Sequence, residues 1–125
     1  MSREPLPDDV RRFVLTSVPS VPYIESLLLM RRETGASWTA SQLASRIYVP
    51  EARAVELLQT LEGSGIATRV DTPTGAYQYA PSQDLAQLLD RVAAHYVTNL
   101  VTITDLIHSS LNRRATQFAD AFRFR

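Results

Sequence analysis

The side chains best suited to chemistry in this sequence are hydrogen-bonding groups in residues 50–62, a stretch that we predict to be helical. Arg53 can donate two hydrogen bonds to guanine, and Gln59 can pair with adenine in the same bidentate way. Thr60 can contact either kind of base. Such side chains on one helix predict the readout of base edges in DNA.

Periodicity predicts which face of this helix is buried. Val55, Leu58 and Leu61 recur at every third position, so we expect them to face the core. Glu56 then lies on the outward face, and Glu51 lies near the N-terminal end, where base edges are usually reached. Both glutamates repel phosphate, so the charge of the helix opposes DNA binding while its hydrogen-bonding groups favour it.

Other polar residues are suited to phosphate contacts, which position a protein on DNA without reading its sequence. The candidates for these contacts are Ser37, Thr39, Ser41, Arg46, Arg69, Thr72 and Thr74. The last two belong to a predicted hairpin tip at 71–75, which contains no Lys or Arg and begins with Asp71. Positive charge for phosphate would therefore come from Arg46 and Arg69.

Groups that react or that hold metals are few. The chain has no Cys, which excludes disulfides and thiolate metal sites. His95 and His108 are thirteen residues apart, about 220° around a helix, so they do not share a face. The sequence also lacks a glycine-rich phosphate loop, a carboxylate cluster and a nucleophile elbow. We therefore predict no enzyme activity, no catalytic residue, no cofactor and no metal.

Composition indicates one soluble domain with balanced charge. The 125 residues suit a single core, and thirteen Arg against thirteen acids leave a net charge of zero. A nucleic-acid binder usually has a basic excess, so strong nonspecific DNA binding is not expected. The longest apolar run, 27–30, is too short to span a bilayer, and the first residues do not form a secretory signal. We expect a cytoplasmic protein with no membrane partner.

Local signals predict helices followed by a hairpin in the middle of the chain. Thr39 and Gln42 have the spacing of a capping box, and Pro50 suits the start of the next helix. A Gly-Ser-Gly stop ends that helix, and alternating residues around a Pro/Gly tip predict two paired strands at 66–79. Helix, turn, helix and hairpin in this order are typical of a winged helix-turn-helix.

The predicted fold is mainly α with a small β-hairpin wing, in three segments. Residues 1–20 form an arm and a short helix, 21–82 the winged helix-turn-helix, and 83–125 a long C-terminal helix and a short terminal one. Apolar residues repeat along the long helix for about three heptads, which predicts a dimer seam. Its residues are Leu85, Leu88, Leu89, Val92, Tyr96, Leu100, Ile103 and Ile107.

Two parts of the C-terminal segment, one around Asn99 and one at the terminal phenylalanines, each allow two arrangements. Asn99 either sets the register of the seam or faces water while Leu100 lies inside. Residues 112–114 are predicted to interrupt the helix before a terminal one that carries Phe118 and Phe122. Those phenylalanines, with Phe124 beyond them, either fold back on the core or swap onto a partner subunit.

Residues 21–81, about half of the chain, resemble bacterial winged helix-turn-helix transcription regulators. The matching residues are Trp38-Thr39-Ala40, Leu43-Ala44, Val55, Leu58, Leu61 and Gly65-Ile66. The resemblance implies that 50–62 is the recognition helix, that 71–75 is the wing, and that the helix after the wing makes the dimer. The C-terminal pattern FADAFRFR looks like the signature of a small family, to which no function is attached.

These observations predict a sequence-specific transcriptional regulator that binds double-stranded DNA as a homodimer. The alternative is a winged-helix module that docks on another protein through its acidic helix and does not bind DNA directly.

Overall fold

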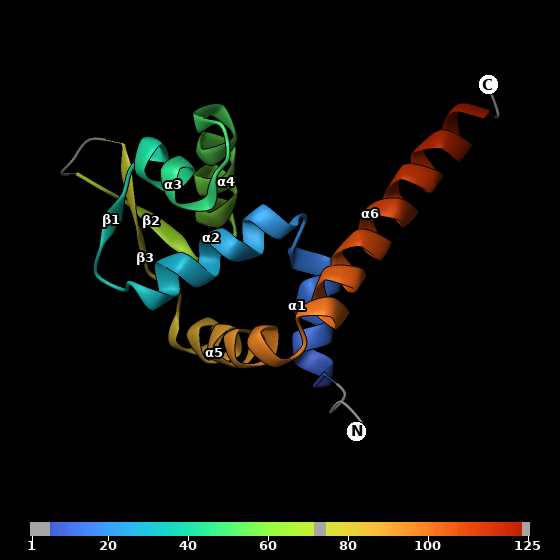
Figure 1. Cartoon of the computed structure of the whole chain (residues 1–125), viewed down its shortest axis with the longest axis horizontal. Coiled ribbons are helices and arrows are strands. Elements are labelled where there is room, and N and C mark those ends of the chain that lie inside the picture. Colours follow the sequence, from blue (N-terminus) through green and yellow to red (C-terminus); the bar gives the residue numbers. More distant parts are fainter. Residues whose placement is uncertain (1–5, 72–74, 124–125) are drawn as a thin grey trace. The chain divides into compact units, whose positions relative to one another are not determined.

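The computed structural model describes residues 6–71 and 75–123, and it describes side-chain surroundings as far as Leu111. The chain is mainly helical with a small antiparallel sheet (Figure 1). The elements in chain order are α1 (Asp8–Ser17), α2 (Val21–Arg32), β1 (Ser37–Trp38), α3 (Ala40–Ile47), α4 (Glu51–Gly63), β2 (Ala67–Val70), β3 (Ala76–Tyr79), α5 (Gln83–Thr98) and α6 (Leu100–Arg123).

These elements divide between two compact units. The central unit, Pro22–Leu89, holds α2, the sheet, α3, α4 and the first part of α5. The terminal unit joins Met1–Val21 to Asp90–Arg125 and holds α1, the end of α5 and α6. Segments from the two ends of the chain therefore pack together, although they are separated by the whole central unit in sequence.

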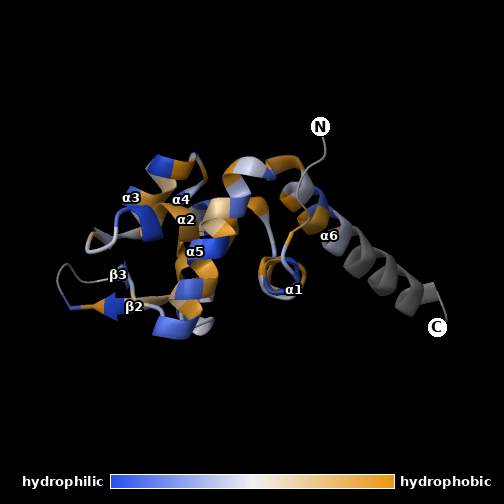
Figure 2. Ribbon diagram, turned by 90° about the horizontal axis from the view of Figure 1, so that it is seen from below, coloured by the Kyte–Doolittle hydropathy of each residue, from blue (hydrophilic) through white to orange (hydrophobic). Residues whose placement is uncertain are grey.

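The core of the central unit forms where its helices meet the sheet. Tyr23, Leu27, Leu43 and Leu58 are fully or almost fully buried, and α4 contacts both α3 and β2. Each helix carries both hydrophobic and hydrophilic residues, as the colours in Figure 2 show. This amphipathic pattern lets each helix bury one stripe and leave the opposite face in water.

The sheet has the strand order β1-β3-β2, with both pairs antiparallel. The β2–β3 hairpin confirms the two predicted strands. The sequence predicts only an extended piece around Ser37, whereas the structure pairs this piece with β3, placing Ser37 opposite Gln78. The side-chain amide of Gln78 also donates to the Gly35 carbonyl at 2.9 Å, which secures the loop before β1.

Local caps fix the positions of α3 and α4. The predicted capping box is confirmed, because the Thr39 N–H donates to Gln42 Oε1 at 3.0 Å and the Gln42 N–H donates to Thr39 Oγ1 at 3.2 Å. Tyr48 ends α3 in the left-handed conformation, and its N–H donates to the Ala44 carbonyl. Pro50 precedes α4, where a missing amide hydrogen costs nothing.

In the terminal unit, α1 packs beside the first half of α6 (Figure 1). Val10 and Val14 of α1 and Ile103 and Ile107 of α6 are fully buried. The Ser110 hydroxyl donates to a carbonyl of α1 at 3.4 Å. Helix α6 is therefore part of an intrachain core.

The C-terminal helices differ from the prediction. The break falls at Asn99, between α5 and α6, and α6 continues through 112–114 to Arg123. Asn99 is only 5% exposed and its amide donates to Thr98 Oγ1 at 3.2 Å, whereas Leu100 is 48% exposed. The alternative with Asn99 in water and Leu100 inside is therefore wrong. The Asn side chain forms local hydrogen bonds that compete with helical geometry, which explains the break.

The side chains of Phe118 and Phe122, and the whole of Phe124, lie outside the described residues. Within the described residues, no single helix is long and apolar enough to cross a membrane, and the bent pair α1 and α2 meets that test only when the two are taken together.

Candidate nucleic-acid interface

The outward face of α4 carries the three predicted base-contacting residues. Arg53, Gln59 and Thr60 are all exposed. Arg53 Nη1 lies 3.9 Å from Glu56 Oε1, one turn along the same helix. The Thr60 hydroxyl donates to the Glu56 carbonyl at 2.8 Å, which leaves its oxygen able to accept. The structure therefore presents these polar groups together on one helix face.

The predicted buried stripe of α4 is wrong at one position. Val55 is 41% exposed, and the buried residues are Ala54, Leu57, Leu58 and Leu61. Steps of three residues drift by about 60° per step around a helix, so Val55 and Leu61 do not share a face. Residues 54, 57, 58 and 61 follow the 3–4 spacing of one stripe. The outward face of α4 thus gains an apolar side chain at its edge, about 40° from Gln59 and about 160° from Arg53 around the helix.

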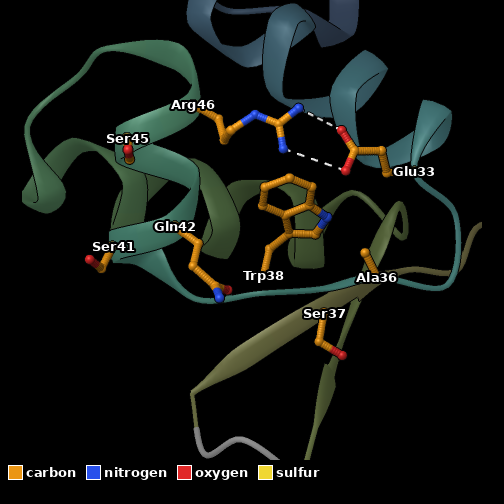
Figure 3. Close-up of a pocket in the computed structure, with 8 residues that line it drawn as sticks. All are labelled: Glu33, Ala36, Ser37, Trp38, Ser41, Gln42, Ser45 and Arg46. Carbon is orange, nitrogen blue, oxygen red and sulfur yellow. Dashed lines mark hydrogen bonds and ion pairs between the residues drawn. The ribbon is translucent and has the colours of Figure 1, made fainter.

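Arg46 of α3 lies in a charged cluster with Glu33 and Trp38 (Figure 3). Its Nη2 donates to Glu33 Oε2 at 2.6 Å and its Nη1 to Glu33 Oε1 at 3.4 Å. The guanidinium carbon stands 5.3 Å from the centre of the Trp38 ring, within range of a cation–π contact. The hydrogen bonds from Arg46 lower the pKa of the Glu33 carboxyl below its usual value. The predicted phosphate contact at Arg46 is therefore already engaged by a carboxylate.

The residues of this cluster line an open pocket of about 510 Å³. Its lining residues are Glu33, Ala36, Ser37, Trp38, Ser41, Gln42, Ser45 and Arg46 (Figure 3). The structure thus brings the predicted phosphate contacts Ser37, Ser41 and Arg46 to one surface. Thr39, between them, uses its hydroxyl oxygen to accept the capping hydrogen bond.

Arg69 lies on β2, beside the hairpin tip. Its Nε lies 3.3 Å from Glu62 Oε2, and its guanidinium carbon stands 5.7 Å from the centre of the Tyr77 ring. Its side chain keeps 64% of its surface exposed, so it can reach a ligand without leaving Tyr77. Thr72 and Thr74 of the predicted wing tip lie outside the described residues.

All three arginines of the candidate interface are matched with glutamates. The pairs are Arg46 with Glu33, Arg53 with Glu56, and Arg69 with Glu62. Sequence reasoning considered only Glu51 and Glu56, because Glu33 and Glu62 become neighbours through the fold. In the sequence, nothing except opposite charge indicates that these residues pair. Many other arginines and acidic residues also carry opposite charges, so this signal does not identify the pairs. The interface is consequently close to neutral, which opposes strong nonspecific attraction to DNA.

The predicted dimer residues divide into two groups. Leu89, Val92, Ile103 and Ile107 are fully buried within the single chain. Leu85, Leu88 and Tyr96 are half-buried, and Leu100 is exposed. The buried group is not available to a second subunit, because partners within the chain already cover it.

Exposed apolar residues lie next to this set at the junction of α5 and α6. Val97 is 81% exposed and Val101 is 55% exposed. Together with Leu100 they form the junction surface, a name we use for these three residues. The sequence stripe missed Val97 and Val101 because a single uninterrupted helix was assumed.

The fold is similar to one solved structure, RV1404 from Mycobacterium tuberculosis. The match has a TM-score of 0.53 at 16% sequence identity, and it covers 90% of this chain and 81% of that chain. At this identity the likeness concerns the fold alone. No family model matches the chain, and no curated protein matches it in sequence.

Proposed function

We propose that this chain is a winged helix-turn-helix transcriptional regulator that binds double-stranded DNA as a homodimer in the cytoplasm. The observation that carries the proposal is the exposed polar face of α4, which follows a capped α3 and precedes the β2–β3 hairpin. In helix-turn-helix proteins the second helix enters the major groove while the first crosses the backbone. Helix α4 would be the recognition helix.

Hydrogen-bonding and apolar groups on α4 suit direct readout of bases. Arg53 suits guanine and Gln59 suits adenine, because each can form two hydrogen bonds with its base. Val55 adds a contact that the sequence did not predict, since an exposed aliphatic side chain fits the methyl group of thymine. The helix would therefore discriminate among bases more through shape and hydrogen bonds than through charge.

Contacts to the DNA backbone would come from α3, β1 and the β2–β3 hairpin. Arg46 and Arg69 can exchange their glutamates for phosphate oxygens, because both arginine side chains are substantially exposed. Each exchange gives up an ion pair, so the net gain in affinity is smaller than for a free arginine. Because of this cost, we expect nonspecific DNA binding to be weak and base contacts to supply a large share of the affinity.

The junction surface, which shares Leu100 with the predicted dimer seam, is the proposed contact between subunits. Val97, Leu100 and Val101 expose apolar area to water, and a second subunit that covered them would remove this area from water. A second copy would cover the same residues on both subunits, as a two-fold interface requires. Tyr96, which belongs to the same unit, is half-buried and can extend it.

The neutral interface also supports the second candidate, a winged helix that docks on another protein. A face with paired charges, an exposed Val55 and the exposed Glu51 resembles a protein-binding surface as much as a DNA-binding one. The two functions differ in their response to DNA at low salt, where any phosphate-binding surface has its highest affinity.

The test is enrichment of genomic DNA fragments by the purified protein at two salt concentrations. The protein should enrich a defined sequence, and Arg53→Ala should weaken binding to that sequence by about ten- to a hundredfold while leaving the dimer intact. Arg12→Ala is the matched control, since it removes an exposed arginine from α1. A folded dimer that enriches no sequence at low salt would overturn the DNA proposal and favour protein docking.

A further inference from the structure

The turn between α3 and α4 carries an aromatic side chain that the fold does not use. Tyr48 is 92% exposed, the largest value among the exposed large hydrophobic residues of the described chain. A ring in water contributes no burial to the core, and a large apolar group left exposed costs solubility. Packing therefore gives no reason for a tyrosine at this position.

The backbone of Tyr48 is also in an unfavourable conformation. Its φ is 61° and its ψ is 49°, and it is the only residue other than glycine with a positive φ in the described chain. Glycine and asparagine adopt this left-handed region at little cost, whereas a bulky side chain does not. Stability alone would thus favour a small residue here. Strained residues of this kind concentrate at functional sites, where the strain fixes the direction of a side chain.

We propose that Tyr48 is a contact to the sugar–phosphate backbone, with its hydroxyl donating to a phosphate oxygen and its ring lying against a sugar. The inference rests on the proposed DNA-binding function. Tyr48 lies at the C-terminal end of α3, the helix that would cross the DNA backbone. It precedes the first residue of α4 by three positions. Tyrosine hydroxyls are among the ordinary phosphate donors in protein–DNA complexes.

A neutral donor suits the paired charges of the candidate interface. In the protein without DNA, each arginine of this interface forms an ion pair with a glutamate, so a phosphate contact must displace that pair. The three arginines are Arg46, Arg53 and Arg69. The hydroxyl of Tyr48 gains a phosphate contact without breaking a pair. It also releases no counterion, so its contribution to affinity does not depend on salt as that of an arginine does.

The experiment uses the DNA sequence that the wild-type protein enriches, and it measures affinity and salt dependence for Tyr48→Phe and Tyr48→Asn. Tyr48→Phe removes only the hydroxyl and should weaken binding about tenfold, with an unchanged salt slope. Tyr48→Asn also removes the ring and should weaken binding further. Its melting temperature should equal or exceed that of the wild type, because asparagine tolerates the left-handed conformation. Thr16→Val, which removes an exposed hydroxyl from α1, is the control and should bind as the wild type does.

A scan of methylphosphonates through the same DNA identifies the contact. One neutralised phosphate should weaken the wild type but leave Tyr48→Phe unaffected, because that variant has already lost the hydrogen bond. If both Tyr48 variants bind like the wild type, or if Tyr48→Asn melts at a clearly lower temperature, the inference is overturned and the DNA-binding function stands. If the wild type enriches no DNA, the DNA-binding function and the role of Tyr48 are both overturned, and a protein partner becomes the better explanation for the exposed ring.

Discussion

The candidate interface of the central unit and the junction surface of the terminal unit differ in chemistry. On the central unit, the candidate interface is polar, and its arginines are paired with glutamates. On the terminal unit, the junction surface exposes Val97, Leu100 and Val101. A polar, neutral face suits a partner that is read through hydrogen bonds, whereas an apolar patch suits removal from water by another apolar patch. Under the proposed function, the central unit recognises DNA and the terminal unit makes the contact between subunits.

The largest expected effect separates intrachain core from subunit interface within α6. Ile107→Ala should lower the free energy of unfolding by about 3 kcal/mol, because Ile107 is fully buried in the terminal unit. The loss should be the same at all protein concentrations. Leu100→Ala, on the exposed side, should change the stability of the monomer little and the dissociation constant of the dimer more. Denaturant unfolding at two protein concentrations measures both. A concentration-dependent loss for Ile107→Ala would return that residue to the subunit seam.

The next effect compares two exposed valines, one on each unit. Val101→Asp places like charges together in a two-fold interface and should weaken self-association by about 2 kcal/mol, roughly thirtyfold. Val55→Asp should leave the dimer intact and weaken DNA binding, because the carboxylate would face the DNA in the proposed complex and repel phosphate. Light scattering and DNA titration of both variants test the separation. If Val55→Asp dissociates the dimer while Val101→Asp does not, the roles of the units are reversed.

The sequence predicted most local structure correctly because its signals are local. The Thr39–Gln42 capping box and the hairpin strands depend on residues only a few positions apart, and the structure contains them. The pairing of β1 with β3 was missed, since it joins Ser37 to Gln78 across a segment that contains α3, α4 and β2. Pattern alone cannot reveal a partner strand at that separation.

Errors in the predicted site have two physical sources. At Val55, a three-residue repeat was taken as a buried stripe although the true stripe begins at Ala54. Along α5 and α6, a continuous heptad pattern concealed the break at Asn99, so core and surface residues were assigned to one seam. The glutamate partners of Arg46 and Arg69 arise from tertiary contacts, which the sequence does not specify residue by residue.

A smaller effect concerns the ion pairs of the two units. Glu33→Gln removes the carboxylate that engages Arg46, so the arginine becomes available to phosphate. We expect DNA affinity to rise by about threefold and the salt slope to steepen by about one phosphate contact. Asp9→Asn makes the same change to the Arg91 pair of the terminal unit and should leave both quantities unchanged. Equal responses of the two variants would contradict the assignment of DNA binding to the central unit.

The smallest effect is the acid dependence of stability, which both units should share. Hydrogen bonds from Arg46 lower the pKa of Glu33 below its usual value, and the hydrogen bond from Arg91 lowers the pKa of Asp9 in the same way. A carboxyl whose pKa is lower in the folded state binds fewer protons there than in the unfolded state. Its contribution to stability is therefore complete above its unfolded pKa and is lost as pH falls through its folded pKa.

Unfolding curves measured as pH is lowered from 6 should show this loss beginning near the ordinary pKa of a glutamate, about 4.3, and continuing below it. Glu33→Gln and Asp9→Asn should each flatten this dependence, since each removes one of the carboxyls whose pKa is lowered in the folded state. Both pairs are exposed to solvent, so high salt should reduce both effects. A variant that keeps the full acid dependence would show that its ion pair does not persist in solution, and that unit would then differ from the other in electrostatics as well as in surface polarity.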